Sequence, residues 1–593
     1  MGKAALVLVL LLAVLGTAFG QLLPNPLPEN DTPEHNKALA DKQYPSARVC
    51  GECHPTQFAQ WSISSHAYAV VSPMFNKFEQ RINDLARGTI NSFCVRCHAS
   101  VGVALGERRD IAWWNRSGAA QEGITCVTCH RVGEAYSKSN GARRITPGDI
   151  HEPVFGPFDT TGVLKAIGNA ERYKILVSSD QPDKPGYTRI HQQAIQSTVI
   201  KQAELCVTCH QVAVHAGIKL ETVWEEYRAS PAFKEGITCQ ECHMSPNPGR
   251  KVEYPRGPAA LLPNGMTVND DRPLSDHTFT GPGYPISHPG LFPIPLKESR
   301  FTPQQWLKFD YRAEWGSDAF ESKVAADTKF PPEWQNAADR KDAWGTVQAN
   351  LVRWEARKEG RIKLLENGSK LDGPFFNGSP QVGRDLSFNY KLTNLNKGHN
   401  LPSGSLGAQP ELWLNVALID PDGKRIWESG YVDSQGDTAD LQSHDVRDRK
   451  IATVDPFKGQ PWPYDDQLFS MQAKFITTNV KGTDREMYLP INLDFDQLPF
   501  IRPGGTPASV NNHPPNVRME KHSIPPLATR TAPYKVPAAL LTKPGTYRLA
   551  ARLRARTEPM YFMDFVFATT DMKRAENRWV TDTHQYAVEF QVH

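Results

Sequence analysis

Every cysteine in this chain belongs to one of five copies of the pattern Cys-x-x-Cys-His. The copies comprise Cys50, Cys53 and His54; Cys94, Cys97 and His98; Cys126, Cys129 and His130; Cys206, Cys209 and His210; and Cys239, Cys242 and His243. This pattern attaches c-type haem, because its two thiols add across the vinyl groups and its histidine binds the iron. Zinc-binding cysteine pairs do not carry a histidine directly after the second cysteine, and a disulfide framework does not repeat one spacing in this way. The motifs therefore predict five covalently bound haem groups.

Residues 1–20 have the parts of a secretory signal. Lys3 gives a short positive start, an apolar run follows, and the small residues Ala18 and Gly20 stand at the spacing expected for cleavage before Gln21. The apolar run is short for a membrane span, which favours cleavage over an anchor, and no later segment is apolar enough to cross a membrane. Covalent haem attachment takes place outside the cytoplasmic membrane. The sequence thus predicts a periplasmic, extracellular or cell-surface protein with an extended leader at residues 21–45.

The net charge of the protein changes sign once haem is counted. The polypeptide has a formal net charge of +3. Each haem brings two propionates, so the net charge of the mature holoprotein is expected to be about −8. No tract of lysine and arginine indicates nucleic-acid binding, and we exclude that class of function. Electrostatic steering would favour a basic patch on a redox partner.

The motifs all lie in the first part of the chain, where residues 46–299 are predicted to form a haem domain. Regular periodicity is weak there, so we expect short helices at the motifs and haem in place of side chains at the core. An internal repeat relates CVRCHASVGV to CVTCHQVAVH and EGITCVTCH to EGITCQECH. Such a repeat predicts one structural unit used twice, each with two closely packed haems.

The sequence pattern changes after residue 300. Trp344, Val347, Leu351 and Trp354 recur at helical spacing, which predicts an amphipathic helix in a linker at 300–370.

From 371 to 593 apolar residues alternate with polar ones, as at 386–392, 412–418 and 547–553. Several such strands joined by Gly/Pro turns predict an antiparallel β-sandwich of immunoglobulin-like type. It contains no enzyme motif. The long loop at 430–535 is predicted to be a contact surface.

The second axial ligand of each haem separates an electron carrier from an enzyme. A second histidine gives a six-coordinate iron suited to electron transfer, whereas an open position can bind substrate. The predicted second ligands are His66, His151, His191, His277 and His399, with His215 and His288 in reserve. Because candidates outnumber the positions to be filled, two histidines per iron are favoured. A ligand at His399, which follows a predicted strand, would explain why a β-domain is joined to a haem domain.

Several strings resemble the cytochrome c-554-type multihaem family. They are CGECHPTQFAQWSISSHA at the first motif, then LCVTCHQ, WEEYRASPAFKEGITCQECHM and DHTFTG, and together they span much of residues 46–290. GHNLPSG is similar to a signature of the β-domain joined to some members. The resemblance implies electron transfer in respiratory chains of exported compartments. It implies redox protein partners, such as other cytochromes and quinol-oxidising or terminal reductase complexes.

The same family leaves an enzymatic alternative open. It has relatives among nitrite reductases and hydroxylamine oxidoreductases, and one member type has a five-coordinate haem. The chain lacks a Cys-x-x-Cys-Lys motif and has fewer haem motifs than the oxidoreductases. A reductase of a small nitrogen or sulfur oxyanion would need cationic groups beside an open haem, for which Arg108, Arg109, Arg143 and Arg144 are available. Electron transfer without a catalytic residue is the preferred prediction, and self-association of copies is a further hypothesis.

Overall fold

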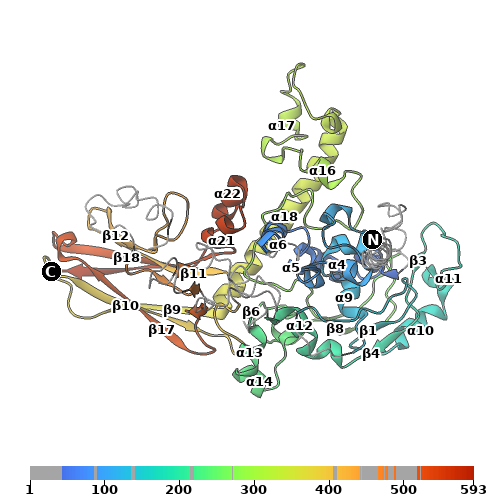
Figure 1. Ribbon diagram of the computed structural model, residues 1–593, viewed down its shortest axis with the longest axis horizontal. Helices are drawn as coiled ribbons and strands as arrows, with labels where there is room; N and C mark the ends of the chain where they lie inside the picture. The colour runs from blue at the N-terminus through green and yellow to red at the C-terminus, as the bar shows by residue number, and fades with distance from the viewer. Residues whose placement is uncertain are drawn as a thin grey trace, which may run out of the picture.

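The computed structural model describes the chain from residue 43 to the C-terminus, with gaps. The described residues are 43–85, 90–134, 140–213, 219–269, 271–404, 410–440, 443, 465–472, 474–477, 487–488, 517–520 and 522–593. The predicted signal at 1–20 lies outside them, as does nearly all of the predicted leader. Figure 1 shows a motif-bearing region, coloured blue to green, and a region of long strands, coloured yellow to red, on either side of one long helix.

Short helices and loops make up the motif-bearing region. Each Cys-x-x-Cys-His motif overlaps a short helix: α3 (Ala47–Gly51), α7 (Val95–His98), α9 (Cys126–His130), α12 (Glu204–His210) and α15 (Cys239–His243). The strands of this region are also short, as in β1 (Val154–Gly156), which pairs in parallel with β4 (Ala194–Gln196). The prediction of short helices at the motifs is confirmed.

Local caps explain where several of these helices begin. Ser64 accepts a hydrogen bond from the backbone N–H of Ala67, 3.2 Å away, at the start of α5 (Ser65–Tyr68). Thr238 and Glu241 form a capping box at the start of α15. Helices of one or two turns are marginal by themselves. Their persistence therefore depends on what packs against them.

The apolar core of the motif-bearing region is divided into small clusters. One contains Trp61 and Val70 with Cys126 at its margin, and another contains Val127 and Leu205 with Cys129 at its margin. The haem-binding cysteines therefore lie at the edges of separate clusters. This is the arrangement expected where haem completes the core.

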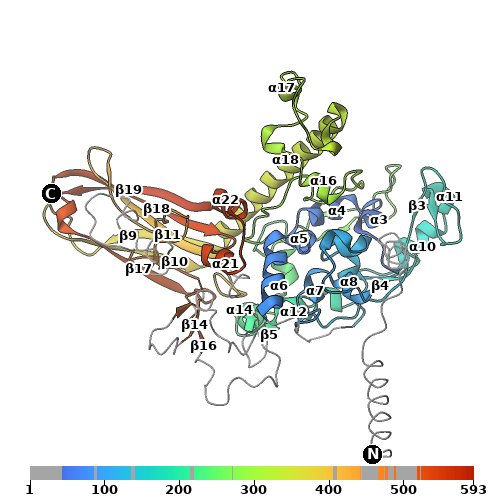
Figure 2. The ribbon, with the colours of Figure 1, turned by 45° about the horizontal axis from the view of Figure 1, so that its top comes forward.

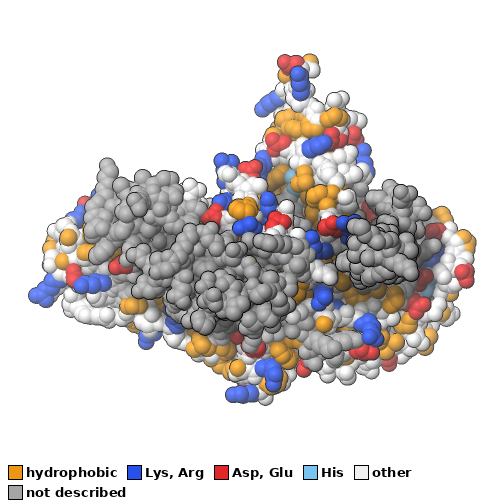
Figure 3. Space-filling view, in the orientation of Figure 1, with side chains coloured by type: hydrophobic (Ala, Val, Ile, Leu, Met, Phe, Trp, Pro, Cys, Tyr) orange, Lys and Arg blue, Asp and Glu red, His pale blue; other side chains and the backbone are white. Residues whose placement is uncertain are grey.

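One helix, α18 (Ala337–Gly368), connects the two regions over 32 residues. The predicted amphipathic helix is confirmed: Val347 and Trp354 are buried, and Trp344 and Leu351 pack beside Val347. With α16 (Pro303–Trp306) and α17 (Asp318–Glu321), the N-terminal half of α18 forms an aromatic lobe that projects from the molecule (Figure 1). Figure 3 shows hydrophobic side chains on the surface of this lobe.

Long antiparallel strands form the C-terminal region. One sheet has the order β17-β10-β9, and the other has the order β12-β11-β18-β19 with β13 also paired to β11. These strands are β9 (Ser369–Phe376), β10 (Leu386–Asn394), β11 (Glu411–Ile419), β12 (Arg425–Ser429), β13 (Phe469–Ser470), β17 (Thr529–Val536), β18 (Gly545–Arg556) and β19 (Thr581–Val592). Phe388 of one sheet and Leu414 and Leu549 of the other belong to one core.

The predicted alternation of burial is confirmed in β10 and in β18 up to its last two residues. It fails in β11, which is buried at seven of nine positions because β12, β13 and β18 pair with it and both of its faces are covered.

A helical insertion between β18 and β19 reaches back to the motif-bearing region. Met560 and Met563 of α21 (Met560–Phe565) pack with Met74 of α6 (Pro73–Leu85), and Figure 2 shows α21 beside α6. The helix α22 (Thr570–Arg578) completes the insertion. Much of the predicted contact loop at 430–535 lies outside the described residues. Among the helices of the described stretches, none has both the length and the apolar character of a membrane span.

Candidate multihaem site

Backbone carbonyls orient the motif histidines. Nδ1 of His54 lies 2.7 Å from the carbonyl oxygen of Ala259, and Nδ1 of His130 lies 2.8 Å from that of Phe155. A carbonyl at Nδ1 fixes the ring and leaves Nε2 as the metal-binding nitrogen. Burial lowers the pKa of His243 to about 4. The imidazole is therefore neutral, which is the form that binds a metal.

Three motif histidines each face a histidine from outside the motifs. The ring centroids are 6.0 Å apart for His243 and His399, 6.3 Å for His210 and His66, and 6.5 Å for His130 and His277. An imidazole nitrogen binds a transition metal at about 2 Å, so two rings on opposite sides of one iron have centroids roughly 6 Å apart. The spacing of each pair therefore fits an iron between the rings.

His191 interacts electrostatically with a fourth motif histidine. Burial, followed by repulsion from His54, lowers the pKa of His191 to about 4. Nδ1 of His191 lies 3.1 Å from the carbonyl oxygen of Gln193. The ring thus has the same carbonyl support as the motif histidines.

The structure does not bring His151 to a motif histidine. Its Nδ1 lies 2.9 Å from the carbonyl oxygen of Ile190, and its Nε2 lies 3.1 Å from Nη1 of Arg189. The nitrogen that would bind iron therefore faces a guanidinium. The reserve candidate His288 is also engaged at both nitrogens, by Phe309 and by Gly290.

His98 has different surroundings from the other motif histidines. The ring of Phe75 stacks on it, with centroids 3.8 Å apart and planes 7° apart. Within the stretches that the structure describes, no histidine from outside the motifs is brought to His98, and His215 lies outside those stretches. Sequence reasoning did not identify Phe75, because its place in an ordinary amphipathic helix carries no signal of this contact.

Cysteines of different motifs lie near one another. Interaction with a cysteine of another motif raises the pKa of Cys126, Cys97 and Cys206, whose respective neighbours are Cys50, Cys209 and Cys239. Cys129 interacts electrostatically with both Cys206 and Cys209. The first, third, fourth and fifth motifs therefore follow one another in space, and the second motif joins at the fourth.

The β-region carries His399 into the motif-bearing region on a loop that is fastened by polar contacts. Lys397 forms an ion pair with Glu235, with 2.8 Å between Nζ and Oε2. The hydroxyl of Ser403 donates to Oε2 of Glu226 at 2.7 Å. Glu226 lies within α13 (Val223–Arg228), and Glu235 directly follows α14 (Pro231–Lys234). The loop that brings His399 opposite His243 therefore contacts the segment of α13 and α14.

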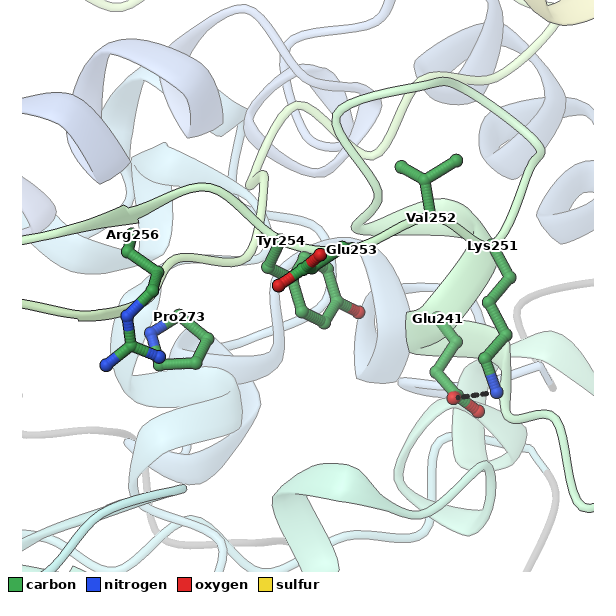
Figure 4. Close-up of a pocket in the computed structure, with 7 residues that line it drawn as sticks. All are labelled: Glu241, Lys251, Val252, Glu253, Tyr254, Arg256 and Pro273. Carbon is green, nitrogen blue, oxygen red and sulfur yellow. Dashed lines mark ion pairs between the residues drawn. The ribbon is translucent and has the colours of Figure 1, made fainter.

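A surface pocket opens beside the fifth motif (Figure 4). Its lining consists of Glu241, Lys251, Val252, Glu253, Tyr254, Arg256 and Pro273. Glu241 lies inside the motif and forms an ion pair with Lys251, with 2.7 Å between Oε1 and Nζ. Charged groups of both signs therefore surround the exposed side of α15.

These residues fit c-type haem. Cysteines lie at the margins of the core clusters, and three motif imidazoles face imidazoles from outside the motifs at the spacing that an intervening iron requires. The site defines a multihaem c-type cytochrome. Residues 49–131 match the family model described as cytochrome c554 and c-prime, in agreement with the resemblance seen in the sequence.

Comparison with solved structures found two similar chains. A penta-haem cytochrome c552 from Thermochromatium tepidum has 15% sequence identity and a TM-score of 0.46, over 92% of this chain and 98% of that chain. An alkylpurine DNA glycosylase from Pseudomonas fluorescens, bound to DNA containing an abasic site analogue, has 7% identity and a TM-score of 0.12, over 44% of this chain and 40% of that chain. No curated protein matches the chain.

Proposed function

We propose that the protein is an exported electron carrier with five haems, most of them held by two histidines. The proposed pairs are His54 with His191, His130 with His277, His210 with His66, and His243 with His399. The distances within three of these pairs and the carbonyl contacts at Nδ1 support this ligand set. His151 is left out of it, because Arg189 faces its Nε2.

The observation that carries electron transfer is the proximity of cysteines from different motifs. Haem bound at these motifs would supply iron that takes up and releases one electron. Because these cysteines would hold each haem by its edge, neighbouring cysteines from two motifs would bring two such edges together. The motifs thus provide one continuous path with a branch at the fourth.

Several further parts of the proposal rest on the sequence. They are cleavage of the signal at 1–20, export to the periplasm or the cell surface, a role in respiration, redox protein partners, and the division into 46–299, 300–370 and 371–593. The shared core of the two antiparallel sheets supports an immunoglobulin-like sandwich for the last of these. The loop that carries His399 gives this β-domain a direct part in holding the fifth haem.

Electron paramagnetic resonance (EPR) of the oxidised holoprotein tests the ligand set. We expect His399→Ala to convert one low-spin haem to a high-spin haem, because one iron loses its second imidazole. In the matched control His151→Ala, every haem that is low-spin in the parent protein should remain low-spin. An unchanged spectrum of His399→Ala, or a new high-spin signal from His151→Ala, would contradict the proposed pairs.

The surroundings of His98 favour one second candidate function. In the described part of the chain Phe75 contacts this ring and no second histidine is placed there, so the second motif is where a small nitrogen or sulfur oxyanion would bind. A high-spin EPR signal of the parent protein that shifts on addition of nitrite or hydroxylamine would support a reductase. A spectrum that neither compound alters would remove this candidate.

A further inference from the structure

A single arginine joins the two CVTCH motifs. Nη1 of Arg143 donates to the carbonyl oxygen of Thr128 at 3.0 Å, and Nη2 donates to that of Leu205 at 3.1 Å. Nη2 also donates to the hydroxyl of Thr208. Thr128 and Thr208 occupy the same position within the third and fourth motifs. The guanidinium therefore lies between two haem attachment sites.

The backbone before Arg143 also contacts the second motif. The N–H of Gly141 donates to the carbonyl oxygen of Thr208 at 2.5 Å. A Cβ at Gly141 would lie 2.9 Å from Sγ of Cys97 and 2.7 Å from Cβ of Arg96, and the φ of Gly141 is +72°. Only glycine fits a position that is both left-handed and this crowded. The segment thus brings Arg143 to a junction of three motifs.

The charge of Arg143 has no direct counter-ion at this junction. Within the described residues no carboxylate lies at salt-bridge distance from it, although Glu134 and Glu204 line the same narrow hollow. Its Nε is buried and makes no hydrogen bond. Among the groups that interact with its charge are Cys209, Cys129, Cys97 and Cys206.

Haem attachment removes even those partners. A cysteine that has added to a vinyl group is a thioether and carries no negative charge, whereas the propionates leave the opposite edge of the porphyrin. The hydrogen bonds of Arg143 go to two carbonyls and a hydroxyl, which are neutral. The holoprotein therefore keeps a fixed positive charge at the thioether edges of three neighbouring sites.

We propose that Arg143 raises the reduction potential of the haems at the second, third and fourth motifs, with the largest effect at the fourth. Reduction lowers the charge of the iron by one unit, so a fixed positive charge nearby favours the reduced form. The fourth motif is affected most because Arg143 contacts Leu205 and Thr208 and interacts with Cys206, Cys209 and His210. The charge would therefore favour the reduced form most at the branch point of the path. This inference deepens the proposed electron-transfer function and rests on it.

Potentiometric titration of the Arg143→Gln holoprotein, followed by haem absorption, tests the proposal. We expect part of the titration curve to move to lower potential while the remaining part stays in place. Arg144→Gln is the matched control, because the adjacent side chain is exposed. Any shift that Arg144→Gln produces should disappear at high salt, whereas the shift from Arg143→Gln should persist, since salt screens partly buried charges much less than exposed ones.

A second variant separates charge from hydrogen bonding. Arg143→Lys keeps the charge but loses part of the hydrogen-bond fork, and its curve should stay close to that of the parent protein. An unchanged curve for Arg143→Gln would overturn the proposal. The proposal would also be overturned if the titration curve of Arg143→Lys moved as far as that of Arg143→Gln. Loss of haem from both variants would overturn it too, because the role of Arg143 would then be structural. Failure of the parent protein to exchange electrons with any redox protein would instead refute the proposed function and leave the potentials measurable.

Discussion

The motif-bearing region and the C-terminal sheets are held together in different ways. In the sheets, Phe388, Leu414 and Leu549 belong to one continuous core to which both layers contribute. In the motif-bearing region the buried side chains form separate clusters with cysteines at their margins. The difference teaches that the first region depends on a covalent cofactor for its core, whereas the second can stabilise itself by side-chain packing.

The largest effect is expected when haem attachment is prevented. A chain produced without attached haem should lose its structure in the motif-bearing region and keep the two sheets, since only the sheets have a continuous core. Limited proteolysis with mass spectrometry would show rapid cleavage before about residue 300 and protection of the strands β9, β10, β11, β17, β18 and β19. The holoprotein under the same conditions is the control. Equal protection of both regions in the apo chain would refute the comparison.

A buried ion pair in the sheets provides the next test. Arg556 of β18 donates from Nε to Oε2 of Glu411 of β11 at 2.9 Å, and the two side chains are 0% and 2% exposed. Arg556→Met should lower the free energy of unfolding of the sheets by about 3–5 kcal/mol, because the glutamate is left buried and unpaired. Denaturant unfolding monitored by circular dichroism measures this change.

The exposed ion pair between Arg574 and Asp571 offers the matched control for that experiment. Arg574→Met should change stability by about 0–1 kcal/mol, as is usual for exposed pairs. Equal losses from the two methionine variants would show that burial does not govern this region.

Two buried leucines compare the regions directly. Leu414→Ala in the continuous core should lower the free energy of unfolding by about 3 kcal/mol, because apolar burial is lost and a cavity remains. Leu262→Ala in the small cluster beside Cys53 should cost less, because covalent haem attachment restrains the surrounding chain. Thermal unfolding of each holoprotein, followed in the far ultraviolet and at the haem absorption band, separates the two regions. Equal losses of stability from the two variants would mean that the divided core of the motif-bearing region is as cooperative as the continuous core of the sheets.

The smallest effect is expected where the two regions meet through exposed charges. Lys397 and Glu235 are 49% and 43% exposed, so Lys397→Gln should change stability by less than about 1 kcal/mol and leave the EPR spectrum unchanged. Lys370→Gln, which removes a similar pair with Asp372 inside the sheets, is the control. A much larger loss from Lys397→Gln would show that this ion pair positions the loop of His399.

Features set by local sequence were predictable, whereas features set by distant contacts were not. Motif spacing and strand alternation report on neighbours in the chain, so the motif helices, α18 and the strand β10 could be predicted. His151 and His277 look equivalent in sequence, but Arg189 faces the Nε2 of the first and the ring of His130 faces the second. The stacking of Phe75 on His98 has no local signature either.

The position of His399 has a consequence for the order of biosynthesis. In the proposed ligand set, the iron held by His243 is completed by a residue that leaves the ribosome long after the fifth motif. Until the sheets fold and the loop closes on Glu226, that iron would be exposed to whatever small ligands its compartment contains. A chain truncated before the sheets would carry a haem without its second histidine, so in this ligand set folding of the C-terminal region would complete the fifth haem site.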